Sequence, residues 1–233
     1  MPPRLLVGAV FGATPLAERF ERAGHTVRPL DIHDDPGAVA HVDLVLLDGP
    51  SADIRTACER VADHARPRQM FLHTALEEGQ QLLDNVETSH AITMCAHNIF
   101  DNVWVTSAAD ELGETVVGLL IAEIGGVSLR IPDQARPAIA AAQELRAMEA
   151  VVRDDALELL TQAVPGFDAV APQFLQAPAG PRTTRSPARL EQLVQAVPDP
   201  GAKRLFVDLV RRRGEVDGDT DTELWAIHKY EGG

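Results

Sequence analysis

The stretch Leu5-Leu-Val-Gly-Ala-Val-Phe-Gly-Ala13 decides the fold of the first half of this chain. Its opening part, Leu5–Val10, is a short apolar run with β-branched residues, which predicts a buried strand. Apolar residues at helical spacing predict a helix over Pro15–Ala23. A second strand, His25–Leu30, then ends at Asp31. The order strand, glycine-containing turn, helix, strand is typical of a parallel β-α-β unit.

The same alternation continues as far as residue 131. Short apolar runs predict strands, and longer amphipathic segments between most of them predict helices. Because helices of this length link the strands, we expect right-handed crossovers and a Rossmann-like α/β fold, with a mainly parallel sheet and helices on both faces. The further strands are expected at Val42–Leu47, Gln69–Thr74, Ala91–Cys95, Val103–Thr106 and Val127–Ile131, and the further helices at Asp53–Ala65, Glu77–Leu83 and Asp110–Ile124.

The pattern changes at Pro132, after which no strand signal remains. The segment that follows is rich in Ala and Glu and predicts a helix to about Val164. We therefore expect two domains, a Rossmann-like dinucleotide-binding-type domain over 1–131 and an all-α domain over 132–233. The second domain is expected to have an exposed loop at Ala177–Pro187, a turn at Pro198–Gly201, and helices at Arg189–Val197, Lys203–Arg213 and Glu223–Lys229.

The first turn has the outline of a dinucleotide-binding loop, G-x-G-x-x-G/A. Gly8 fits its first position and Ala13 its third, but Val10 stands at the second, where a glycine lets a pyrophosphate approach the backbone. We expect the isopropyl group of Val10 to interfere there, so that dinucleotide binding is in doubt. Phe11, Gly12 and Thr14 complete the predicted loop. The N-terminus of the following helix could instead bind a mononucleotide or an organic anion near Thr14.

Asp31 lies where an acidic residue can bind the adenosine ribose and repel a 2′-phosphate. NAD is therefore favoured over NADP if a nicotinamide cofactor binds. In the alternative interpretation Asp31 only begins an acidic turn, because Asp is common in turns.

Other polar or turn residues follow the predicted strands and are expected at the same sheet edge. Gly49 and Pro50 follow the third strand, and these join Asp31 as predicted cofactor-binding residues. His73 and Thr74 end the fourth strand and are predicted to contact the cofactor or another ligand. Further cleft residues are expected at the end of the fifth strand, namely Cys95, His97 and Asn98. Cys95 could act as a nucleophile with His97 as its base, but without a third group to orient the histidine this arrangement is weak.

Composition restricts the partners. The net charge is −14, and a surface this acidic repels phosphate backbones and anionic lipid, so we expect no nucleic-acid or membrane partner. No signal-peptide pattern or 20-residue apolar run occurs, which predicts a cytoplasmic protein. We expect no metal site, since His33 with its two neighbouring aspartates has the character of a solvated turn. The basic stretch at Lys203–Arg213 is expected to form ion pairs or subunit contacts.

With these residues in view, the chain resembles the 6-phosphogluconate dehydrogenase-like superfamily. More closely, it resembles short bacterial Rossmann-like proteins with an uncharacterised helical C-terminal domain, which are similar in layout to coenzyme F420-dependent NADP oxidoreductases. The resemblance implies NAD(P)-dependent oxidoreductase chemistry, a small-molecule ligand and a homodimer built by the C-terminal helices. The matching segments run from Gly8 to Val27, then Val42-Asp-Leu-Val-Leu-Leu-Asp-Gly-Pro50, Phe71-Leu-His-Thr74, Ile124-Gly-Gly126 and Ile131-Pro-Asp-Gln-Ala-Arg136.

The chain also departs from that superfamily. His97-Asn98 replaces a His-Pro dipeptide, and alanines around Ala140 and apolar residues around Met148 stand where relatives carry a histidine and an asparagine. Two hypotheses follow: an oxidoreductase-like protein with a degenerate cofactor loop, or a catalytically inactive Rossmann protein that acts as a small-ligand-binding or regulatory dimer.

Overall fold

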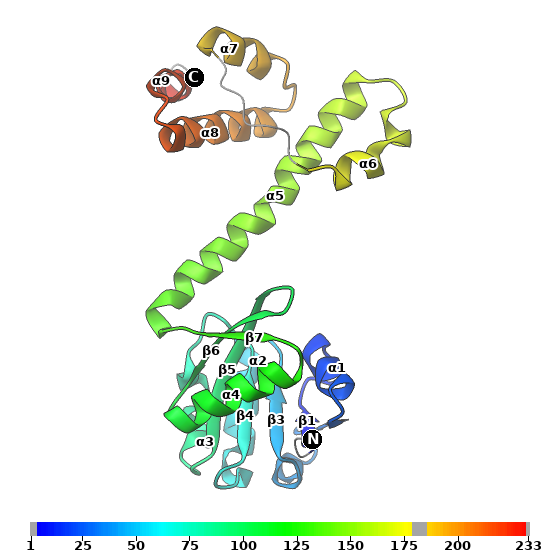
Figure 1. Cartoon of the computed structure of the whole chain (residues 1–233), viewed down its shortest axis with the longest axis vertical. Coiled ribbons are helices and arrows are strands. Elements are labelled where there is room, and N and C mark those ends of the chain that lie inside the picture. The colour runs from blue at the N-terminus through cyan, green and yellow to red at the C-terminus, as the bar shows by residue number, and fades with distance from the viewer. Residues whose placement is uncertain (1–3, 179–185, 232–233) are drawn as a thin grey trace. The chain divides into compact units, whose positions relative to one another are not determined.

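The computed structural model describes residues 4–178 and 186–231. It confirms the expected α/β class with an all-α region after it (Figure 1). The strands are β1 (Leu6–Ala9), β2 (Thr26–Pro29), β3 (Leu44–Leu47), β4 (Met70–His73), β5 (Ile92–Phe100), β6 (Val103–Ala108) and β7 (Val127–Arg130). The α-helices are α1 (Pro15–Arg22), α2 (Ser51–Val61), α3 (Asp84–Glu87), α4 (Glu111–Glu123), α5 (Arg136–Ala163), α6 (Ala171–Gln176), α7 (Pro187–Gln195), α8 (Pro200–Asp217) and α9 (Thr220–Glu231).

A seven-stranded sheet forms the centre of the N-terminal unit, in the order β2-β1-β3-β4-β5-β6-β7. β1 to β5 are parallel to one another, whereas β6 is antiparallel to β5. β5 and β6 pair as a hairpin because only Asp101 and Asn102 separate them, and a parallel crossover needs a dozen or more residues. The strand order reverses at β1, which lies between β2 and β3. Ligands bind open α/β sheets at such a point, beyond the carboxyl ends of the strands.

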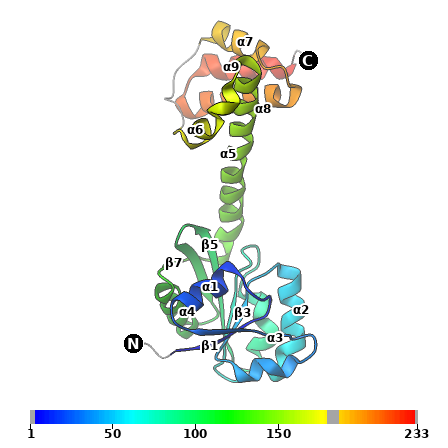
Figure 2. The same ribbon diagram turned by 90° about the vertical axis from the view of Figure 1, so that its right-hand side faces the viewer.

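Two apolar clusters hold helices on opposite faces of the sheet (Figure 2). Alternate residues of β3 point to opposite faces, so Leu44 and Leu46 join the cluster under α1 and α4, while Val45 and Leu47 join the cluster under α2 and α3. Both faces are therefore buried, which explains why the strands of this sheet are continuous apolar runs.

Several predicted elements differ in detail. The short helix expected at Glu77–Leu83 is a 3₁₀ turn at Gln80–Leu83 followed by α3. The fifth strand continues beyond Cys95 to Phe100, because pairing with β6 supports it. In place of the expected turn at Pro198–Gly201, Pro200 begins α8, with Asp199 as the N-cap that accepts from the Ala202 amide. The predicted loop at Ala177–Pro187 lies mostly outside the described residues, and its last residue, Pro187, begins α7.

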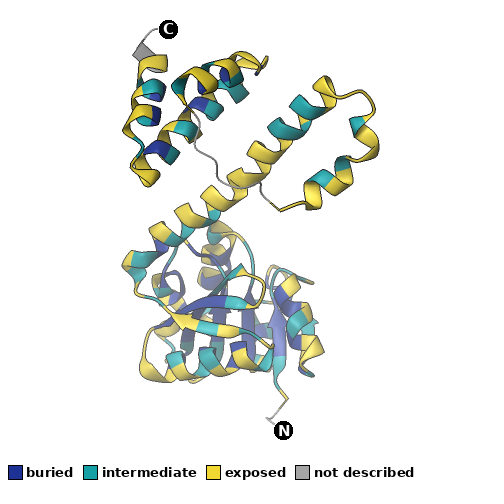
Figure 3. Ribbon diagram, turned by 45° about the horizontal axis from the view of Figure 1, so that its top comes forward, coloured by how far each residue is buried: buried dark blue, intermediate teal, exposed yellow. Residues whose placement is uncertain are grey.

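The chain divides into two compact units, Met1–Glu144 and Leu145–Gly233. The division falls within α5, so the first two turns of this helix belong to the unit that contains the sheet. In the second unit, a small cluster of Val194, Val207 and Ala226 joins α7, α8 and α9. Figure 3 shows the buried residues concentrated in the strands, whereas most of α5 is exposed. Among the described residues, no helix combines the length and apolar character needed to cross a membrane.

Candidate functional site

The turn between β1 and α1 lies at the carboxyl edge where the strand order reverses. Val10 donates its backbone N–H to Leu46 of β3 at 3.1 Å, and its side chain packs against the apolar cluster beneath α2. Gly12 has φ +77° with open space around the position of a Cβ, a conformation that glycine adopts at no steric cost. Thr14 is the N-cap of α1, and its Oγ1 accepts from the amide of Ala17 at 3.3 Å.

Phe11 lies against Gly49, which follows β3. A Cβ built on Gly49 would be 2.8 Å from Cδ2 of Phe11 and 3.1 Å from its Cγ. The ring therefore occupies the space that a side chain at residue 49 would need. Phe11 is partly buried and packs with Val10 on the cluster beneath α2.

A cavity of about 580 Å³ lies on the β2 side of this contact, and we call it the β2-side cavity. Asp31 stands at its wall, and its Oδ1 accepts from the backbone amides of His33 at 3.0 Å and Asp34 at 3.2 Å. Asp31 thus does stabilise the acidic turn that the sequence offered as an alternative. The cavity is lined by Val10, Phe11, Gly12, Pro29, Leu30, Asp31, Ile32, His33, Asp53, Thr56, Ala57 and Arg60.

Arg60 is a lining residue that the sequence analysis missed. Its Nε donates to the carbonyl of Ile32 at 3.2 Å and its Nη2 to that of His33 at 2.7 Å. Asp53, Thr56 and Arg60 follow one another at helical spacing on α2, so they share the face that looks into the β2-side cavity. The helical spacing of these three polar residues is the feature of the sequence from which Arg60 could have been predicted.

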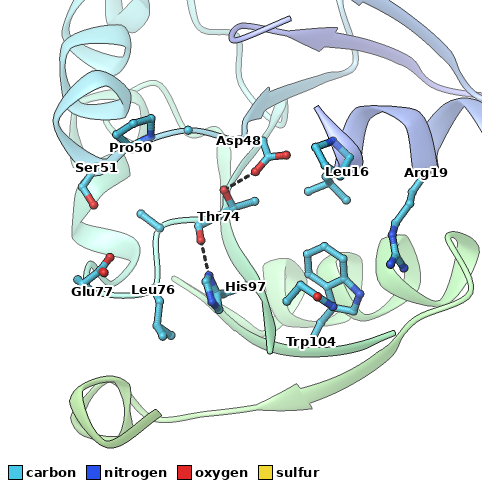
Figure 4. A pocket seen from close by; sticks show the side chains of 14 residues that line it. Leu16, Arg19, Asp48, Pro50, Ser51, Thr74, Leu76, Glu77, His97 and Trp104 are labelled. Carbon is cyan, nitrogen blue, oxygen red and sulfur yellow. Dashed lines mark hydrogen bonds between the residues drawn. The ribbon is translucent and has the colours of Figure 1, made fainter. Parts of the chain in front are cut away.

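A second cavity, of about 440 Å³, lies beyond the ends of β3 and β4 and beside the last residues of β5 (Figure 4). We call it the β4-side cavity. The predicted residues Gly49, Pro50, Thr74, His97 and Asn98 all line it. Its full lining consists of Pro15, Leu16, Arg19, Asp48, Gly49, Pro50, Ser51, Thr74, Ala75, Leu76, Glu77, His97, Asn98 and Trp104.

Thr74 connects the polar groups of the β4-side cavity. Its hydroxyl donates to Oδ1 of Asp48 at 2.7 Å, and its carbonyl lies 2.8 Å from Nδ1 of His97 (Figure 4). A carbonyl oxygen only accepts, so His97 carries a proton at Nδ1 and donates it there. Nε2 of His97 lies 3.1 Å from Oε1 of Gln143, whose amide nitrogen donates to the carbonyl of Asn98.

Asp48 and Gln143 also escaped the sequence analysis. Asp48 directly follows β3, which places it at the sheet edge. Gln143 is the next residue after the alanines of α5, and from there it reaches His97. At the far wall, the guanidinium of Arg19 lies 5.7 Å from the ring centroid of Trp104 and donates to the carbonyl of Asp101.

His73 and Cys95 are not among the residues that line these two cavities. His73 is fully buried, and burial, with a smaller effect of the charge on Arg136, lowers its pKa to about 4. The Cys95 thiol contacts the carbonyl of Ala75 and Nη1 of Arg136, and burial raises its pKa. A buried thiol with a raised pKa is a poor nucleophile, and the contacts of Cys95 with Ala75 and Arg136 do not support the predicted pairing with His97.

Arg136 anchors the start of α5 in the N-terminal unit. Its side chain is buried, its Nε pairs with Oδ1 of Asp133 at 2.9 Å, and Nη1 donates to the carbonyl of Leu76. Nη2 donates to the hydroxyl of Ser107. Within the described ranges, no group of three or more His, Cys, Asp and Glu side chains is placed to hold a metal ion.

Residues 132–229 match the model of the 6-phosphogluconate dehydrogenase C-terminal domain-like family. No curated protein sequence matches the chain.

Solved structures share the fold at low identity. A candidate NADP oxidoreductase from Bacteroides fragilis is 14% identical, with a TM-score of 0.66, over 91% of this chain and 98% of that one. An imine reductase from Pseudomonas sp. is 11% identical, with a TM-score of 0.64, over 97% and 99% of the two chains. A pyrroline carboxylate reductase from Plasmodium falciparum, solved with NADP bound, is 9% identical, with a TM-score of 0.57, over 98% and 97%. The comparisons agree with the resemblance predicted from the sequence: residues 132–229 match the 6-phosphogluconate dehydrogenase C-terminal domain-like family, and the chain shares its fold with solved oxidoreductases.

Proposed function

We propose that this protein is an NAD(P)-dependent oxidoreductase-like protein that binds its cofactor across the carboxyl edge of the sheet. One observation carries the proposal: separate cavities flank the β1–α1 turn, at the place where the strand order reverses. A dinucleotide has two ends joined by a pyrophosphate, and helix N-termini bind phosphate. The adenosine end would occupy the β2-side cavity and the nicotinamide end the β4-side cavity.

The residues of the β2-side cavity fit an adenosine. Leu30, Ile32 and Ala57 supply apolar walls for a purine. The Asp31 carboxylate, held in place through Oδ1, would accept from ribose hydroxyls with its other oxygen. A 2′-phosphate would meet this negative charge, so we favour NAD over NADP.

The β4-side cavity has polar groups for a substrate. A bound nicotinamide would supply two-electron redox chemistry at this end of the cleft. The residues that orient a substrate would be Asp48 and His97, both linked to Thr74. Because Nδ1 of His97 donates to the carbonyl of Thr74, its Nε2 would be the atom that exchanges a proton with a substrate, and this atom lies 3.1 Å from Oε1 of Gln143.

Fluorescence titration with NADH and NADPH tests this function. We expect submillimolar binding, with NADH preferred by about tenfold because Asp31 repels the 2′-phosphate. Asp31→Ala should narrow the preference, while Asp53→Ala, at the same cavity, serves as a control for general loss of negative charge. The proposal fails if neither nucleotide binds at millimolar concentration.

A second candidate is a catalytically inactive protein that binds a smaller ligand. The contact of Phe11 with Gly49 favours it, because this contact lies where a pyrophosphate would pass. The expected interference by Val10 remains a prediction. If Val10→Gly restores dinucleotide binding, that result would support the expected interference by the Val10 side chain.

We also propose that the protein is a homodimer that associates through its C-terminal helices. The support is a row of exposed apolar residues on α5, namely Leu145, Met148, Val151 and Val152. These residues recur at helical spacing, so they form one face that a second copy could cover.

A further inference from the structure

The cleft at the carboxyl edge is divided. Among the described residues, none lines both the β2-side cavity and the β4-side cavity. Phe11 belongs to the lining of the first and Gly49 to that of the second. The contact between these two residues therefore lies on the boundary between the cavities.

Both sides of the boundary are supported by their surroundings. Phe11 packs on the apolar cluster beneath α2. On the other side, Asp48 precedes Gly49 and accepts the hydroxyl of Thr74, and Pro50 follows it. The absence of a side chain at Gly49 is what allows the ring to lie so close, because a Cβ there would be 2.8 Å from Cδ2 of Phe11. The ring is nevertheless only partly buried, so it can move without opening the core.

We propose that Phe11 is a specificity-determining partition, a role that rests on the proposed function. With the ring on Gly49, the β2-side cavity accepts an adenine mononucleotide on its own. A dinucleotide must displace the ring before it can span the two cavities. The ring therefore penalises the longer ligand and leaves the shorter one unaffected.

Calorimetric titration with AMP and NADH tests the partition on wild type and Phe11→Ala. In the wild type we expect the two nucleotides to bind within about threefold of each other, because the nicotinamide half adds little while the ring blocks its path. Phe11→Ala should strengthen NADH binding by about tenfold or more and change AMP binding by less than about twofold.

Two further variants keep the test decisive. Leu6→Ala is the matched control, since Leu6 packs on the same cluster but lines neither cavity, and it should leave the ratio of the two affinities unchanged. Phe11→Leu keeps an apolar side chain on the cluster but removes the flat ring, and it should give an intermediate ratio if Phe11→Ala fails to fold. Thermal melts verify that each variant is folded.

The outcomes separate the two proposals. Wild-type protein that binds NADH more than about tenfold tighter than AMP, with no change in Phe11→Ala, would overturn the partition and leave the proposed function standing. Failure of every folded variant to bind either nucleotide would overturn the proposed function, and the partition with it.

Discussion

At the scale of single residues, burial decides which polar side chains can take part in chemistry. The sequence places both His73 and His97 near strand ends. His73 is nevertheless fully buried, whereas His97 lies at the wall of the β4-side cavity. Cys95 is likewise enclosed between a carbonyl and Arg136. The polar groups that a ligand at this sheet edge could reach are therefore those around Thr74. His73 and Cys95 affect the stability of the fold instead.

His73 should make the stability of the protein depend on pH. Its pKa is about 4 in the folded protein and 6.5 as a reference value, so the unfolded chain takes up the proton first as pH falls. Above pH 6.5 the ring is neutral in the folded and the unfolded protein, and the contribution of His73 to the free energy of unfolding is at its highest. Between pH 6.5 and 4 this free energy falls by roughly 3 kcal/mol.

Urea unfolding of wild type and His73→Gln over this pH range measures the effect. The variant should show the weaker decline in unfolding free energy, because the other acidic and basic groups are common to both proteins. Equal declines would contradict a depressed pKa for His73.

At the scale of elements, the start of α5 depends on one buried cation. Arg136→Met should lower the free energy of unfolding by about 3 kcal/mol, because Asp133 loses its partner and the carbonyl of Leu76 and hydroxyl of Ser107 lose a donor. Urea titration gives the value. Arg130→Met is the matched control: Arg130 also pairs with an acid, Glu114, but is largely exposed, so its loss should cost less than about 1 kcal/mol. Similar costs for both variants would show that the burial of Arg136 has little energetic weight.

The β5–β6 hairpin is the element that completes the β4-side cavity. β5 continues past the end of β4, and this extension carries His97 and Asn98 to the cavity, while Trp104 comes from the paired strand. The first turns of α5 reach the same extension through Gln143. The hairpin thus joins the sheet to the helix that begins the C-terminal region.

At the scale of the whole molecule, the exposed apolar face of α5 should control association. Light scattering of the wild type should give a dimer, and the double variant Leu145→Glu with Met148→Glu should give a monomer, because two like charges on that face could not be buried without partners. Glu149→Gln alters the neighbouring charge without touching the apolar face and should remain dimeric. A monomeric wild type, or a dimer that survives the charged pair, would contradict this assignment.

The alternation of apolar runs with amphipathic segments was sufficient to predict the α/β fold and the helical C-terminal region. The strands are buried on both faces, and burial leaves a continuous apolar signature in the sequence. The same pattern did not reveal that β6 reverses direction. That follows from the two-residue connection after Phe100, which a β-α-β interpretation overlooks.

The residues of the candidate site were predictable to the extent that strand ends meet at one edge of a parallel sheet. Gly49, Thr74, His97 and Asn98 line one cavity for that reason, and Asp31 lines the other. His73 and Cys95 were expected at the same sheet edge for the same reason, but both are buried beneath it. Residues on helices, such as Arg60 and Gln143, were missed because helical spacing gives a face and does not say what that face meets.

The sequence by itself determined the fold class and the position of the turn at which a ligand would bind, because both depend on local periodicity and on the glycines near residue 8. The tertiary structure decided which side chains meet. Phe11 and Gly49 are far apart in the chain, as are His97 and Gln143 and also Arg136 and Cys95, and each contact exists because the sheet brings separate crossovers together. Long-range packing of this kind leaves no periodic trace in the sequence, so the division of the cleft could be seen only in the folded molecule.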